Sequence, residues 1–158
     1  MQIDTTEIDR LAADLGDVGA LAGPFINSAI QYTSKNISEA AQKKVSKRKL
    51  FSVAAGAIDY EVAVFRGFGA SVLKSEIGYD KDKPAGALGN LLEFGAPNAK
   101  AHMLVKRDGK WIAVPVPGDR ARPVTPGNEL ATSMKENEDD FEKGLSKALA
   151  DAEKKAGL

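Results

Sequence analysis

The spacing of the hydrophobic residues changes twice along this chain, and that change restricts the fold more than any other feature of the sequence. Up to residue 45 apolar positions recur at helical spacing, with an inner stripe from Ile26 to Val45. Between residues 58 and 77 apolar and polar residues alternate, as they do in half-buried strands. Helical spacing returns between 126 and 157. This order predicts an α+β fold, in which a small antiparallel β-sheet packs against a long N-terminal helix and a C-terminal helix.

Short motifs predict where the helices begin and end. Asp4 is expected to cap the first helix, and Gly23-Pro24 is expected to break or kink it. Thr125 is the predicted N-cap of the last helix, with Pro126 as its first residue. The apolar stripe of that helix is expected at Leu130, Met134, Phe141, Leu145, Leu149 and Ala152.

Turn residues divide the middle of the chain. Gly67-Phe68-Gly69 predicts a tight turn between two strands, and Arg107-Asp108-Gly109 between apolar runs predicts a projecting hairpin. The segment Leu88–Phe94 is expected to add a strand or a short helix. At 158 residues the chain is predicted to form a single domain. Its four regions are a helical region (1–49), a sheet and hairpin (50–116), a proline-rich connector (117–125) and a helix (126–157).

Composition excludes several classes of protein. Charged residues balance to a formal net charge of zero, whereas a protein that coats nucleic acid needs a basic excess. The chain has no cysteine, so disulfides are excluded. No apolar run approaches the ~20 residues that cross a bilayer, so no membrane contact is expected. The acidic residues Asp4, Glu7 and Asp9 differ from the basic start of a secretory signal, so a soluble protein made in a cytoplasm is expected.

Few residues could perform catalysis. His102 is the only histidine, and the sequence pairs it with no nucleophile, so we expect a structural or solvent-facing side chain. The glycines at 67 and 69 lack the third glycine of a dinucleotide-binding motif. The sequence therefore predicts a protein that is not an enzyme, with no catalytic residue, no metal site and no cofactor.

Charges gather in separate segments despite the zero balance. Residues 35–49 contain six basic residues and one acidic residue, and five carboxylates lie between Glu136 and Glu142. These segments are either solvated helix faces or complementary surfaces that meet between copies of the chain. Glu93, alone in an apolar run, is either on the solvent face of a sheet edge or in an ion pair across a subunit boundary.

The order of these elements resembles a tail-component family of long-tailed bacteriophages, named after gene product ten of a lambdoid phage. Members carry a Glu-Phe-Gly signature after their sheet, which is Glu93-Phe94-Gly95 here. A proline and a C-terminal helix follow it, here Pro123 or Pro126 and the segment from Leu130. The resemblance covers most of residues 25–155.

The resemblance implies a structural virion protein of the tail–neck junction, present in the host cytoplasm before assembly. Its subunits would form a hexameric ring for tail completion or head–tail joining, with the tail tube protein and head–tail connector proteins as partners and incidental contact with DNA. A tail terminator that caps the tube, and a small soluble protein-interaction module, are the alternatives. The predicted subunit-interface residues are Glu93, Phe94, Gly95, Lys43, Lys44, Lys47, Arg48, Trp111, Arg120 and Arg122.

Overall fold

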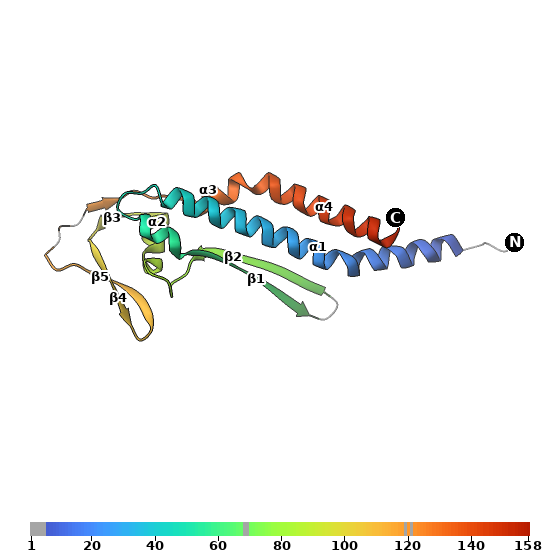
Figure 1. Cartoon of the computed structure of the whole chain (residues 1–158), viewed down its shortest axis with the longest axis horizontal. Coiled ribbons are helices and arrows are strands. Elements are labelled where there is room, and N and C mark those ends of the chain that lie inside the picture. The colour runs from blue at the N-terminus through green and yellow to red at the C-terminus, as the bar shows by residue number, and fades with distance from the viewer. Residues whose placement is uncertain (1–5, 68–69, 119, 121) are drawn as a thin grey trace. The chain divides into compact units, whose positions relative to one another are not determined.

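A computed structural model describes residues 6–67, 70–118, 120 and 122–158, and in these ranges it confirms the predicted α+β class (Figure 1). A long N-terminal helix precedes small antiparallel sheets, and helices end the chain. The elements, in chain order, are α1 (Thr6–Val45), η1 (Ser52–Ala57), β1 (Ile58–Gly67), β2 (Ala70–Tyr79), η2 (Gly86–Leu88), α2 (Gly89–Phe94), β3 (Ala96–Ala99), β4 (His102–Arg107), β5 (Lys110–Pro115), β6 (Arg122–Val124), α3 (Glu129–Glu136) and α4 (Glu138–Ala156).

The single predicted sheet is replaced by three two-stranded sheets, β1–β2, β3–β6 and β4–β5. The β1–β2 hairpin pairs Gly67 with Ala70, and Phe68 and Gly69 of the predicted turn lie outside the described residues. The β4–β5 hairpin is confirmed, because Asp108 and Gly109 both have the positive φ angles that its tight turn requires. Part of the proline-rich connector pairs with β3 as the edge strand β6, a position that tolerates proline.

Two predictions about helix boundaries were wrong. A break at Gly23-Pro24 was wrong, because α1 continues from Thr6 to Val45 with Pro24 inside it. The fixed φ of proline is compatible with an α-helix, but its ring removes one backbone hydrogen bond, so the kink stays a prediction. Asp4, its predicted cap, lies outside the described residues. The C-terminal region contains two helices, because Asn137 ends α3 and donates its side-chain amide to the carbonyl of Ser133 at 2.8 Å.

The chain divides into two compact units. One unit comprises residues 1–33 and 138–158, and its helices approach closely through small side chains. Ala22, Ala148 and Ala152 are buried there, and a Cβ atom at Gly144 would lie 3.7 Å from that of Ala29. The single-domain prediction stays a prediction, since a compact unit need not be an independent domain.

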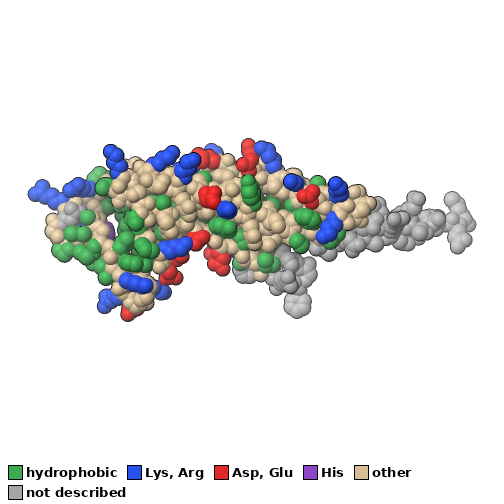
Figure 2. Space-filling model, viewed as in Figure 1, with side chains coloured by type: hydrophobic (Ala, Val, Ile, Leu, Met, Phe, Trp, Pro, Cys, Tyr) green, Lys and Arg blue, Asp and Glu red, His purple; other side chains and the backbone are tan. Residues whose placement is uncertain are grey.

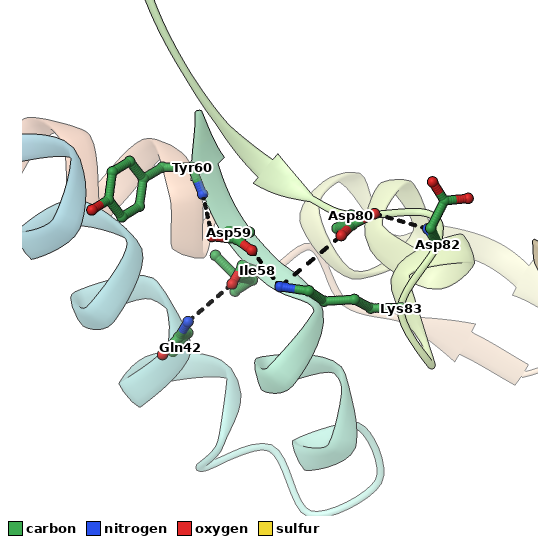
Figure 3. A network of polar contacts seen from close by, with 7 residues as sticks. All are labelled: Gln42, Ile58, Asp59, Tyr60, Asp80, Asp82 and Lys83. Carbon is green, nitrogen blue, oxygen red and sulfur yellow. Dashed lines mark hydrogen bonds and ion pairs between the residues drawn. The ribbon is translucent and has the colours of Figure 1, made fainter. Parts of the chain in front are cut away.

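The second unit, residues 34–137, contains the sheets and the larger core. The side chain of Gln42 on α1 donates to the carbonyl of Ile58, which fixes the start of β1 (Figure 3). Lys83 pairs with Asp59 and lies 4.0 Å from Asp80, which anchors the loop after β2. The hydrogen bond from Lys83 holds the pKa of Asp59 below its usual value. The buried core consists of Ala41, Val45, Ala54, Ile58, Ala85 and Leu92.

Candidate functional site

Glu93, the acidic residue of the Glu-Phe-Gly signature, is buried in α2 with 6% of its surface exposed. Its two carboxylate oxygens accept the backbone N–H groups of Leu130 and Ala131 at 3.2 and 3.1 Å. These N–H groups belong to the first turn of α3, where helical donors have no partner within the helix and favour negative charge. The carboxylate therefore caps α3 from a distant segment. The expectation of a solvent-facing residue on a sheet edge was wrong, because a carboxylate with both oxygens bonded can be buried.

Gly95 makes the turn that this capping requires. Its φ of +68° lies in a region that side chains disfavour, and a Cβ atom there would lie 2.5 Å from the carbonyl oxygen of Val124. The chain therefore leaves α2 close against the segment that leads into α3. Between these two fixed residues, Phe94 projects outward with 71% of its surface exposed.

Arg48 joins three segments of the same unit. Its Nε atom lies 2.9 Å from Oε1 of Glu129, which is only 6% exposed. Its terminal nitrogens donate to the carbonyls of Leu92 at 3.2 Å and Thr125 at 2.8 Å. A Cβ atom at Gly127 would lie 1.8 Å from Oε2 of Glu129, so a larger residue there would have to displace this carboxylate. Arg48 thus connects the end of α1 to α2 and to the start of α3.

Tyr79 completes what we call the junction cluster: Arg48, Tyr79, Glu93 and Glu129. Burial and the nearby carboxylates of Glu129 and Glu93 raise the pKa of Tyr79 to about 12, and Arg48 opposes this shift. Both oxygens of Glu93 and all three nitrogens of the Arg48 guanidinium already bind groups of this chain. The junction cluster therefore has a structural role, because its bonds fix the position of α3 relative to α2 and the end of α1.

The basic run from Lys43 to Lys49 divides between internal and exposed roles. Lys44 pairs with Glu136 at 2.6 Å, and Arg48 belongs to the junction cluster. Lys43, Lys47 and Lys49 are exposed. No local pattern indicates which of these basic residues are internal, because that depends on where α3 returns to the end of α1.

The other predicted interface residues lie on the β4–β5 hairpin and near β6. Trp111 is half-buried on β5, while Arg120 and Arg122 are exposed. With Lys43, Lys47 and Phe94, these two arginines present free surface, whereas Glu93, Arg48 and Lys44 are bonded within the chain. The role of all of these residues between subunits stays a prediction.

A cavity of about 660 Å³ lies beside the junction cluster, and His102 is at its edge (Figure 2). It forms between four segments of residues 34–137 that are far apart in the sequence, so sequence spacing could not reveal it. The residues that line it are Arg48, Lys49, Leu50, Phe51, Leu88, Leu91, Ala99, Lys100, Ala101, His102, Arg122, Pro123, Val124 and Thr125.

Large apolar side chains are unusually exposed on the described residues, while small ones fill the core. Seven of the eleven buried hydrophobic residues are alanines, namely Ala22, Ala41, Ala54, Ala57, Ala85, Ala148 and Ala152. Leu50 is 86% exposed and Tyr32 is 68% exposed. Single apolar residues are normal on surfaces, and here the exposed ones are large while most of the buried ones are alanines. The apolar stripe predicted for the last helix is also only partly buried, because Met134 and Leu149 are exposed.

No family model, curated protein or solved structure matches this chain. Among the described residues, no helix combines the length and hydrophobicity needed to span a membrane. The same residues contain no group of three or more His, Cys, Asp or Glu side chains placed to hold a metal ion.

Proposed function

We propose that this chain is a structural virion protein of the bacteriophage neck, a ring-forming tail-completion or head–tail joining subunit that links the tail tube to the head connector. The Glu93-Phe94-Gly95 signature and its context support the family. One structural observation carries the proposal: large apolar side chains lie outside while alanines fill the core. Such a chain gains by burying its surface against other subunits, because each large side chain covered contributes about 1.5–3 kcal/mol.

The junction cluster supports an assembly role as well. Glu93 is bonded within the chain, Gly95 lies close against the carbonyl of Val124, and Phe94 projects between them. A rigid element that presents one exposed aromatic residue is the usual form of an interface anchor, since little conformational entropy is lost on binding. The signature therefore has a physical reason: two of its residues build the turn and the third is presented to a partner.

The test measures the mass of the purified chain over a range of concentrations, alone and with tube and connector proteins. We expect a closed ring, hexameric in the simplest case, and particles made without this protein should carry overlong or unattached tails. Phe94→Ser should weaken assembly while circular dichroism stays unchanged. A chain that remains monomeric and binds none of these proteins would overturn the proposal. Binding to an unrelated protein without ring formation would favour a small interaction module.

A further inference from the structure

The cavity beside the junction cluster has an apolar wall and a basic rim. Leu50, Phe51 and Leu91 contribute to the wall. The rim includes Lys49, Lys100 and Arg122, and none of the described residues that line the cavity is Asp or Glu. Such a surface favours a ligand that combines negative charge with apolar groups.

The rim charges have no partners within the described part of the chain. Arg48 is neutralised by Glu129 at 2.9 Å, but Lys49, Lys100 and Arg122 form no ion pair there, and all three are exposed. Three unpaired cations around one hollow repel each other, and an anionic occupant would relieve that repulsion.

The same chain carries a matching acidic surface at the start of α4. Glu138, Asp139, Asp140 and Glu142 are exposed, and within the described residues only Asp140 forms an ion pair, with Lys143 at 3.8 Å. Cations and carboxylates therefore remain unpaired on two different segments of one chain. Contact between such unlike surfaces is heterologous, and it closes into a ring when the rotation between copies allows.

We infer that the cavity receives the acidic start of α4 from a second copy of this chain, an inference that rests on the proposed function. The carboxylates would lie against the basic rim, and the apolar wall would exclude water and strengthen the ion pairs. A nucleic acid could also neutralise the rim. Its phosphates would leave the apolar wall uncovered, so we favour the protein occupant.

Charge exchange tests this inference. The rim variant carries Lys49→Glu, Lys100→Glu and Arg122→Glu, and the helix variant carries Glu138→Lys, Asp139→Lys and Glu142→Lys. Each variant alone should self-associate about 100-fold more weakly than the unchanged chain, because like charges then face each other. An equimolar mixture should assemble again, because each rim then meets a helix of opposite charge. A control with Lys81→Glu, Lys106→Glu and Lys110→Glu makes the same change of charge away from the cavity and should assemble normally.

The outcomes separate this inference from the proposed function. If the unchanged chain forms rings and the rim variant forms them equally well, the inference is wrong while the proposed function stands. If the unchanged chain neither assembles nor binds tube or connector proteins, the proposed function fails as well. If the rim variant assembles normally but loses salt-dependent affinity for an oligonucleotide, the occupant is a nucleic acid and the inference is overturned. Lysines in the first turn of α4 oppose the helix dipole and could disturb the helix itself. A milder helix variant, with Glu138→Gln, Asp139→Asn and Glu142→Gln, removes the negative charges without adding positive ones and should also weaken association.

Discussion

Replacing Arg48 by methionine tests whether the junction cluster holds the unit of residues 34–137 together. Methionine retains an unbranched chain of similar reach but removes the guanidinium, which contacts Glu129 and two backbone carbonyls. Lys47→Met is the matched control, because Lys47 is the neighbouring basic residue and is exposed. If Arg48 acts within the chain, only its replacement should lower the free energy of unfolding.

The loss in free energy of unfolding depends on which groups lose a partner when the guanidinium of Arg48 is removed. The carbonyl of Leu92 also accepts the N–H of Gly127 at 2.9 Å, and Thr125 is exposed, so water can replace the guanidinium there. Glu129 is 6% exposed and would remain as a buried charge without a cation. Breaking a buried ion pair costs about 3–5 kcal/mol, and we expect the lower end, about 3 kcal/mol. For a chain of this length that corresponds to a fall in Tm of about 6–12 °C.

Urea unfolding followed by the fluorescence of Trp111 measures this loss, since Trp111 lies on β5 in the same unit as the cluster. The double variant Arg48→Met, Glu129→Leu should recover at least about half of the loss, because no charge is then buried alone. Equal stability of Arg48→Met and Lys47→Met would refute the internal role of Arg48. Arg48 would then act as one more exposed residue of the basic run, as the sequence predicts.

Three further predictions concern the same cluster. Glu93→Gln should lower the free energy of unfolding by about 1–2 kcal/mol and speed amide hydrogen exchange in α3, because one acceptor of its N-terminal N–H groups is lost. Gly127→Ala should cost about 2 kcal/mol in urea unfolding, and little of that in a Glu129→Leu background, because the added Cβ atom displaces the carboxylate. Tyr79 has its pKa raised to about 12 from 10.0, so its neutral form contributes stability that is complete below pH 10 and lost as the pH rises to 12. Between pH 10 and pH 12 the free energy of unfolding of the unchanged protein should therefore fall by at most about 2.7 kcal/mol more than that of Tyr79→Phe.

The sequence predicted the features that depend on local patterns. The inner stripe of α1 lies where helical spacing places it, with Thr33, Ile37, Ala41 and Val45 all buried. The β4–β5 hairpin forms at Asp-Gly, because a tight turn selects residues that accept positive φ. These features are encoded within a few neighbouring residues, so a period or a dipeptide is sufficient to identify them.

The start of α3 shows why the remaining features could not be predicted. Thr125 and Pro126 form a strong local start signal, yet the helix begins at Glu129, and its N-cap residue Asn128 makes no side-chain capping bond. The capping acceptors come from Glu93, 36 residues before Glu129 in the sequence. Once a distant carboxylate satisfies those N–H groups, a local cap brings no further gain, and the segment 125–128 is free to approach Arg48 and Gly95 instead. A lone acidic residue in an apolar run is therefore a signal of a buried polar partner, and that partner can be the backbone of another helix.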